Sequence, residues 1–272
     1  MRAVKLAALL AGVPLLAFAG DALAWGLQTH LFFAQHLLLA LPLADPDFRR
    51  AAMRLPRLVL AGACLPDLAL AGRALGTPAF RRSHGWATLR RFAAASSDEE
   101  RALAIGYASH LLADVVAHNQ FVPEHETRIA PLAHVTHAMC EWAMDDYVRG
   151  AVFAAPGELL EMERGMLAAV VASRLQCREA LARRAIGLLA KADRALRASP
   201  LPRLCRALAR RFDHHLAPRF EAYARDTAAR LSQIGAALEG AVPGAEAEPA
   251  SPAGVGAGFW RSGRLLPPQS LA

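Results

Sequence analysis

The sequence predicts an all-α protein, a single domain built as a multi-helix bundle. Ala, Leu and Arg dominate its composition, and runs of β-branched residues are scarce. Both features favour helix over strand. The chain has 272 residues, of which 54% are hydrophobic, and this is enough for one sizeable core. No strand pattern and no internal repeat point to another fold class.

The first 24 residues have the features of a secretory signal peptide. Two basic residues precede an apolar run at residues 6–18, and a small-x-small cleavage site follows at residues 22–24. Cleavage there makes Trp25 the first residue of the mature chain, and an uncleaved anchor is the alternative. We therefore expect an exported protein, periplasmic or secreted. No later apolar run free of charge is long enough for a membrane span.

The helical domain is expected at residues 25–239. Its helices are predicted over residues 28–41, 46–63, 96–118, 132–153, 158–175 and 178–198, with another from about residue 202 to residue 239. Pro56 predicts a kink or break in the second of these. S-S-D-E-E at residues 96–100 offers cap residues and first-turn acids. Residues 119–131 are predicted as a loop, and residues 240–272, rich in Ala, Gly and Pro, as a disordered tail.

Charge and cysteine content leave several possibilities open. The formal net charge is +7. A positive field favours transient contact with phosphates or an anionic membrane surface, although scattered arginines are also typical of solvated helix faces. No stable protein partner is indicated. The cysteines remaining after cleavage can form disulfides or stay as buried thiols, and the sequence selects neither. They are Cys64, Cys140, Cys177 and Cys205.

The most informative stretch reads Y-A-S-H-L-L-A-D-V-V-A-H. It places His110, Asp114 and His118 four residues apart, and thus on one face of a helix. The apolar residues between them indicate burial, and buried imidazoles and carboxylates are costly unless something pairs them. H-A-M-C-E repeats this spacing at His137 and Glu141. We interpret the two helices as walls of a zinc site, because imidazole and carboxylate together suit zinc.

Further candidate ligands precede these helices, and the full set follows a recognisable order. In chain order the candidates are Trp25, His30, Asp67, His84, His110, Asp114, His118, His137 and Glu141. Their motifs are W-G-L-Q-T-H, L-P-D, S-H-G-W, H-L-L-A-D and H-A-M-C-E. As an ordered set they resemble the zinc-dependent phospholipase C family, which shares its fold and tri-zinc site with the single-strand-specific zinc nucleases. The closing glutamate is the phospholipase form.

The resemblance implies three zinc ions. It assigns Asp67, His84, His110 and Asp114 to one ion, the Trp25 amine and carbonyl, His30 and Asp114 to a second, and His118, His137 and Glu141 to a third, more exposed ion. It also implies that a metal-activated water attacks phosphorus, with Asp67 as a ligand and candidate general base. His118 follows the aspartate by four residues where the family has six. His125 and His134 therefore stay open as alternatives.

The resemblance implies a phospholipid substrate, but the headgroup preference departs from the choline-specific members. Where those members carry an acid and two aromatic residues, this chain has Gln28, Leu68 and Arg81. The features that hold a quaternary ammonium are thus missing, and we expect no preference for choline lipids. Two alternatives stay open. One is a nuclease of the sister family, favoured by the spacing from Trp25 to His30 and by the positive charge. The other is a non-catalytic zinc-binding protein.

Aromatic residues near the expected site are few, and helix packing can account for most of them. They are Phe32, Phe33, Trp86, Phe121 and Trp142. A nuclease needs aromatic surfaces on which bases stack. The segments around the ligands are otherwise rich in Leu, Val and Ala, which suits acyl chains better than bases.

Overall fold

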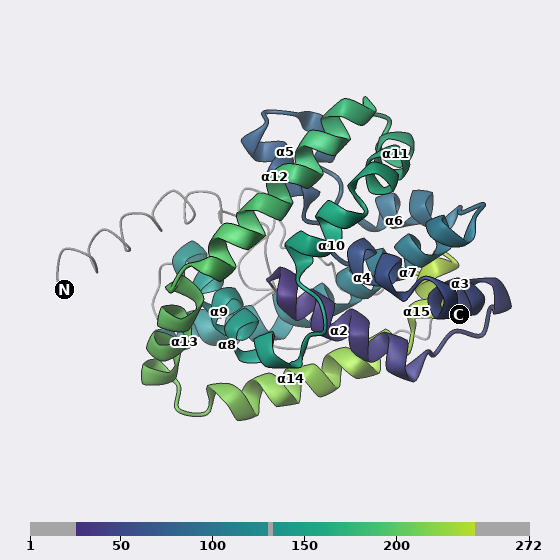
Figure 1. Cartoon of the computed structure of the whole chain (residues 1–272). Helices are drawn as coiled ribbons and strands as arrows, with labels where there is room; N and C mark the ends of the chain where they lie inside the picture. Colours follow the sequence, from purple (N-terminus) through teal and green to yellow (C-terminus); the bar gives the residue numbers. More distant parts are fainter. Residues whose placement is uncertain (1–25, 130–132, 243–272) are drawn as a thin grey trace.

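A computed structural model describes residues 26–129 and 133–242, without the side chains of residues 126–136. The described part consists of helices joined by short turns and contains no strand, which confirms the predicted all-α class (Figure 1). The expected signal peptide, Trp25 and the end of the expected tail lie outside it. Among the described residues, no helix combines the length and the apolar character needed to cross a membrane.

Helix α7 (Asp98–Val116) is the centre of the fold. Its residues from Ala102 to Val116 are all buried. The N-terminus forms as predicted, because Ser97 Oγ accepts a hydrogen bond from the Glu100 amide and the Glu100 carboxylate accepts one from the Ser96 amide. The helices packed against α7 are α2 (Leu27–Ala40), α3 (Pro46–Arg54), α4 (Pro56–Gly62), α6 (Trp86–Ala93), α14 (Leu216–Leu231) and α15 (Ile234–Leu238).

Two glycines let α4 and α7 touch backbone to backbone. A Cβ atom on Gly106 would lie 1.9 Å from the carbonyl oxygen of Val59, and one on Gly62 would lie 2.4 Å from that of Leu103. Only residues without a Cβ atom allow this approach. The contact holds the turn that follows α4 against the middle of α7, where His110 lies.

The remaining helices cover α7 and the helices around it. Helix α9 (Ala133–Val148) packs against α2 and against α13 (Leu201–Phe212), and α12 (Glu179–Ala198) packs on α5 (Leu68–Ala74). In Figure 1, α12 runs from the region of α5 and α11 (Arg164–Leu175) towards α13, and α14 passes alongside α2. The four cysteines form no disulfide in the structure, and Cys177 is the most exposed of them.

Three of the expected segments differ in the structure. The loop predicted at residues 119–131 is largely helical, because the π-helical turn η2 (Ala117–Phe121) leads directly into α8 (Val122–Ile129). The helix predicted over residues 158–175 is two helices, α10 (Pro156–Met162) and α11, which are separated at Glu163 by a non-helical backbone conformation.

The long helix predicted after residue 202 is three helices, α13, α14 and α15. The chain leaves α13 at Asp213, whose backbone is extended. The Asp213 carboxylate accepts hydrogen bonds from the His215 amide and from Arg219 Nε, and these bonds fix the turn into α14. Such Asp turns compete locally with helix, which the amphipathic pattern alone does not reveal.

Candidate metal centre

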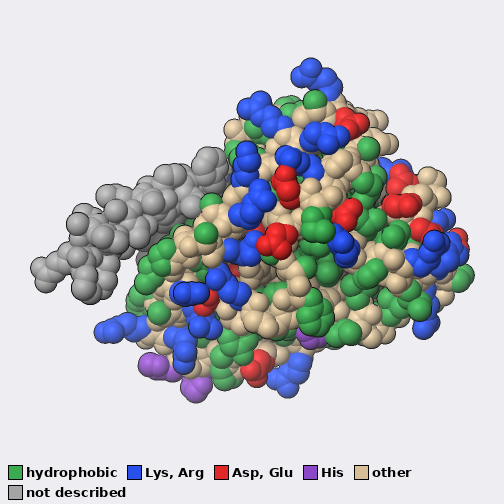
Figure 2. Space-filling model, viewed as in Figure 1, with side chains coloured by type: hydrophobic (Ala, Val, Ile, Leu, Met, Phe, Trp, Pro, Cys, Tyr) green, Lys and Arg blue, Asp and Glu red, His purple; other side chains and the backbone are tan. Residues whose placement is uncertain are grey.

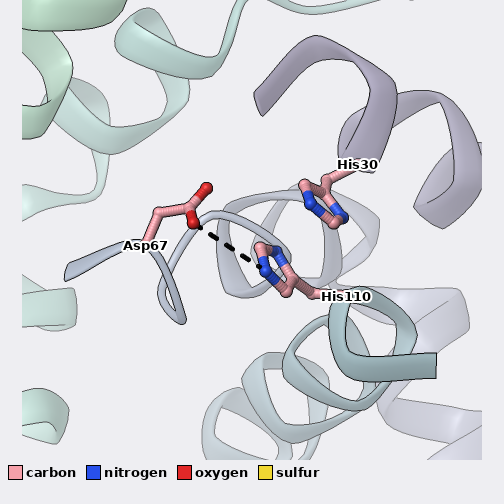
Figure 3. A group of neighbouring side chains, drawn as sticks. All are labelled: His30, Asp67 and His110. Atoms are coloured by element: carbon pink, nitrogen blue, oxygen red, sulfur yellow. Dashed lines mark ion pairs between the residues drawn. The ribbon is translucent and has the colours of Figure 1, made fainter. Parts of the chain in front are cut away.

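Five of the predicted ligands converge in the core. His30 comes from α2, Asp67 from the residue that precedes α5, His84 from the turn before α6, and His110 and Asp114 from α7. None of the five is more than 1% exposed. Figure 3 shows His30, Asp67 and His110 pointing toward one another from three separate segments. The structure therefore brings together residues up to 84 positions apart in the chain, from 30 to 114.

The Asp114 carboxylate lies at the centre of this cluster. Its Oδ2 atom is 3.0 Å from Nε2 of His84 and 3.0 Å from Nε2 of His110. Its Oδ1 atom is 3.4 Å from Nε2 of His30. Neither oxygen makes a hydrogen bond of ordinary geometry with the described residues. A buried carboxylate surrounded by imidazole nitrogens, with its oxygens unsatisfied, has the arrangement of a metal ligand.

The orientation of His110 is set from outside the cluster. Its Nδ1–H donates a hydrogen bond of 2.7 Å to the backbone carbonyl of Ala63, in the turn that the Gly62 and Gly106 contact holds in place. The lone pair is thereby assigned to Nε2, which faces inward and lies 2.8 Å from Nε2 of His84. Two imidazole nitrogens this close repel each other unless a proton or a cation lies between them. A carbonyl that fixes the tautomer of an imidazole is a common feature of metal-binding histidines.

Two groups of described residues have ligand atoms that all lie within 4.8 Å of one another. They are His30, Asp67 and His110, and His84, His110 and Asp114. The second group falls within the first zinc set that the resemblance implies. The first group combines residues of two implied ions, because Asp67 and His110 belong to one and His30 to the other. His30 lies near both Asp67 and Asp114. The donor set of imidazoles and carboxylates fits zinc.

Burial and charge act in opposite directions on the site carboxylates. Burial raises the pKa of Asp67 to about 6. Burial also opposes ionisation of Asp114, but the electrostatic interaction with the surrounding imidazoles outweighs it and holds the pKa of Asp114 well below its usual range. Burial lowers the pKa of His30 and of His118, so both imidazoles stay neutral at neutral pH. Neutral imidazole is the form that binds a metal ion.

The third predicted set is looser. The ring centroids of His118 and His137 are 5.7 Å apart, and those of His118 and His84 are 6.4 Å apart. His137 Nε2 lies 2.8 Å from Glu141 Oε1, and its side chain is 12% exposed. Glu141 is buried, and burial raises its pKa well above the usual value. His118 lies in the π-helical turn η2, a deviation that frequently occurs at functional sites.

The two alternatives to His118 lie elsewhere or are not described. His125 Nδ1–H donates a hydrogen bond of 2.7 Å to the carbonyl of Phe121, and its Nε2 lies 4.0 Å from Oδ2 of Asp213. It thus faces the start of α14. The side chain of His134 lies outside the described residues. The structure therefore brings His118, and not His125, next to His137.

This placement gives a prediction for the third site. We expect His118→Ala to lower the zinc content by about one ion per chain and to leave the innermost cluster loaded. His125→Ala, a control in which the removed imidazole is also buried, should keep the full zinc content. Elemental analysis of both purified variants measures the difference. Full zinc content in His118→Ala together with loss in His125→Ala would reverse the assignment.

A residue that the motifs did not reveal, Asp145, ties two site-bearing helices together. Its Oδ1 atom accepts hydrogen bonds from the amide of Thr29 at 2.9 Å and from Thr29 Oγ1 at 2.8 Å. The first turn of α2, which carries His30, is thereby anchored to α9, which carries Glu141. The position of Asp145 four residues after Glu141, on the same helix face, was the available signal.

Asp145→Asn is expected to change how stability depends on pH. Burial raises the pKa of Asp145 to about 7, from 3.8. The protonated carboxyl therefore contributes stability that is complete below about pH 3.8 and is lost as the pH rises through about 7. An asparagine keeps an acceptor for Thr29 and carries no charge. Its free energy of unfolding relative to the parent should rise across this window by at most about 1.4 kcal/mol per pH unit.

Denaturant unfolding of the parent and of Asp145→Asn at several pH values measures this difference. Asp145→Ala serves as the control. It removes the acceptor as well as the charge, and should lower the free energy of unfolding by roughly 1–3 kcal/mol at neutral pH. A constant difference between the parent and Asp145→Asn from pH 4 to pH 8 would contradict the expectation.

Comparison with known proteins adds one finding. The family model described as zinc dependent phospholipase C matches residues 29–174, more than half of the chain. The matched span contains each candidate ligand from His30 to Glu141, and Trp25 precedes it. No curated protein and no solved structure gave a match.

Proposed function

The chain belongs to the zinc-dependent phospholipase C family, and we propose that it hydrolyses the phosphodiester bond of phospholipids on the glycerol side of the phosphate. The observation that carries this proposal is the buried cluster around Asp114, where three imidazole nitrogens approach a carboxylate whose oxygens make no hydrogen bond with the described residues. A polar cluster of this kind is unfavourable in an apolar core without a cation.

Three zinc ions are part of the proposal. His30, Asp67, His84, His110 and Asp114 would hold the buried ions, with Asp114 shared between them, and His118, His137 and Glu141 would hold the more exposed one. Zinc bound at these positions would lower the pKa of a water molecule toward neutrality and would offset negative charge that develops on the phosphate.

The residues of the chain contribute orientation and proton transfer. The Ala63 carbonyl holds His110 in the tautomer that directs a lone pair inward. Asp67 turns Oδ1 toward His84, at 3.7 Å, whereas its Oδ2 is buried without a partner among the described residues. With a pKa of about 6, that carboxylate is ionised at neutral pH and can accept a proton. The core around the cluster excludes bulk water from these groups.

The aromatic residues near the site support a lipid substrate over a nucleic acid. Phe33, Phe121 and Trp142 are buried in the core, at 2%, 0% and 4% exposure. Phe32 and Trp86 are half-buried, and the ring of Phe32 already makes edge-on or tilted contacts with His36, Phe33 and Phe220. Stacking on an aromatic side chain contributes roughly 1–3 kcal/mol per base in single-strand binding. Side chains already packed into the core do not provide such a platform.

The residues at the three headgroup positions also support the absence of a choline preference. Gln28 and Leu68 are buried, and Arg81 is exposed. None of them offers the aromatic face or the negative charge that attracts a quaternary ammonium. We propose that ethanolamine and anionic phospholipids are cleaved at rates within about tenfold of choline lipids, a factor that corresponds to roughly 1.4 kcal/mol.

The test offers zinc-loaded protein two substrates in parallel, mixed phospholipid micelles and single-stranded DNA. Diacylglycerol release should exceed nucleotide release, and choline lipid should show no advantage. Nucleotide release without diacylglycerol would assign the protein to the nuclease branch. The absence of turnover with either substrate and with a generic phosphodiester would favour a zinc-binding protein without catalysis.

Export is the second part of the proposal and gives a prediction for the N-terminus. Intact mass of the exported protein should correspond to a chain that starts at Trp25. If the Trp25 amine is a ligand, a protein that carries extra residues before Trp25 should lose one zinc ion and most of its activity. The matched control carries the same extra residues at the C-terminus. Full zinc content with the N-terminal extension would remove Trp25 from the ligand set.

A further inference from the structure

Helix α13 carries a row of large apolar side chains that face solvent. Leu204, Leu208 and Phe212 are spaced at four residues and are 53%, 46% and 52% exposed. This spacing places them on one side of the helix. The other large exposed hydrophobic residues lie on separate helices and turns, for example Leu39 on α2 and Met53 on α3. The three residues of α13 form a stripe, here called the α13 apolar stripe.

The stripe is distinct from the face by which α13 joins the fold. Pro202, Cys205 and Ala209 are buried, and α13 packs against α9. These small side chains are enough to seat the helix. The three large side chains are about half exposed, and burying the apolar area that they leave in water would be favourable by roughly 25 cal/mol per square ångström. Contiguous exposed apolar surface of this kind marks an interaction site.

The charges on α13 have one sign. Its arginines are Arg203, Arg206, Arg210 and Arg211, and residues 201–212 contain no acid. Arg206 Nε lies 2.9 Å from Oδ2 of Asp146. Among the described residues, Arg210 and Arg211 make no ion pair. Figure 2 shows hydrophobic side chains beside Lys and Arg side chains over the part of the surface where Figure 1 places α13.

We propose that α13 docks on an anionic phospholipid surface, with the apolar stripe among the acyl chains and Arg210 and Arg211 at the phosphates. A short amphipathic helix with basic residues beside its apolar face has the chemistry of an interfacial helix. The positive charge of two arginines that make no ion pair among the described residues is complementary to anionic lipid. The inference rests on the proposed function, because α9, on which α13 packs, carries His137 and Glu141. Docking through α13 would bring α9, and with it these two residues of the more exposed set, near the surface that contains the substrate.

The experiment measures co-flotation of zinc-loaded protein with vesicles, on ice. One set contains phosphatidylglycerol and phosphatidylcholine, and the other contains phosphatidylcholine alone. The parent should bind the anionic vesicles, and added salt should weaken the binding. Leu204→Ser/Leu208→Ser/Phe212→Ser should reduce binding at least tenfold. Arg210→Gln/Arg211→Gln should reduce it about 30-fold, because each basic side chain at an anionic surface contributes ~1 kcal/mol.

Control variants carry two substitutions of the same kind at exposed positions on other helices. They are Leu39→Ser/Met53→Ser for the apolar stripe, and Arg49→Gln/Arg184→Gln for the two arginines. The controls should bind like the parent. All variants should hydrolyse a short-chain phospholipid at a concentration below that at which it forms micelles, at the parent's rate, because that substrate needs no docking. Thermal unfolding of each variant shows that it is folded.

Several outcomes overturn the inference. They are no binding of the parent to anionic vesicles, parent-like binding by both α13 variants, and equal loss of binding by the controls. A change of oligomeric state in the stripe variant with unchanged lipid binding assigns the stripe to contact between copies of the chain. Vesicle binding by the parent without hydrolysis of the dispersed lipid would remove the proposed function and leave the docking surface in place.

Discussion

Asp114→Asn should remove both activity and zinc from the buried cluster. An asparagine keeps the size of the side chain but loses the negative charge and one of the two oxygens that face His30, His84 and His110. Because that carboxylate lies between the imidazoles, one substitution should disturb two ions at once. Loss of a residue that only orients a metal ligand lowers activity roughly 10–100-fold. We expect kcat/KM of Asp114→Asn to fall by more than that, because this side chain is itself a proposed ligand.

The measurement combines kinetics with elemental analysis of the same preparation. The matched control is Asp193→Asn, a buried carboxylate outside the cluster that accepts a hydrogen bond from the Gly157 amide. It should keep its zinc, whatever its effect on stability. An Asp114→Asn protein with the zinc content and kcat/KM of the parent would show that this carboxylate is not a ligand.

Removal of the metal should abolish hydrolysis and lower the Tm. Without a cation, Oδ2 of Asp67 and both carboxylate oxygens of Asp114 stay buried with no hydrogen-bond partner among the described residues. A ligand that binds only the folded state at about 1,000 times its Kd contributes ~4.1 kcal/mol. For a chain of this size roughly 2–4 °C corresponds to each kcal/mol, so the Tm should fall by roughly 8–16 °C on chelation.

Differential scanning calorimetry with and without a chelator measures the shift, and zinc added in excess should restore both the Tm and the activity. Asp114→Asn provides the internal control, because a protein that has already lost the buried ions should show a much smaller shift. An unchanged Tm in the parent, with zinc removal verified by elemental analysis, would contradict a coupling between metal and fold.

The spacing of residues along a helix predicted part of the candidate site but not all of it. The i, i+4 pattern of His110, Asp114 and His118 predicted one helical face, and all three side chains are buried in the structure. The pattern did not predict the local backbone at His118. That residue lies in a π-helical turn, where the periodicity of the α-helix no longer holds. Asp145 was not recognised, because a carboxylate that anchors another helix has no spacing of its own.

Local sequence signals decided where several helices begin and end. Pro56 separates α3 from α4, Ser97 caps α7, and Asp67 stands at the start of α5, all as expected. These features depend on a few neighbouring residues and on backbone geometry. The breaks at Glu163 and Asp213 were not predicted. The amphipathic pattern continues across them, and the turn at Asp213 depends on a side-chain contact with Arg219.

The sequence by itself determined the helical class, the family and the identity of the candidate ligands, because these follow from composition and from short motifs in a fixed order. Only the tertiary structure decided which ligands lie together. The distance between His84 and His110, the tautomer of His110 and the separation of His125 from the site depend on contacts between segments far apart in the chain. The exposure of the α13 apolar stripe also depends on such contacts. An amphipathic pattern does not predict which of its apolar residues a neighbouring helix will cover.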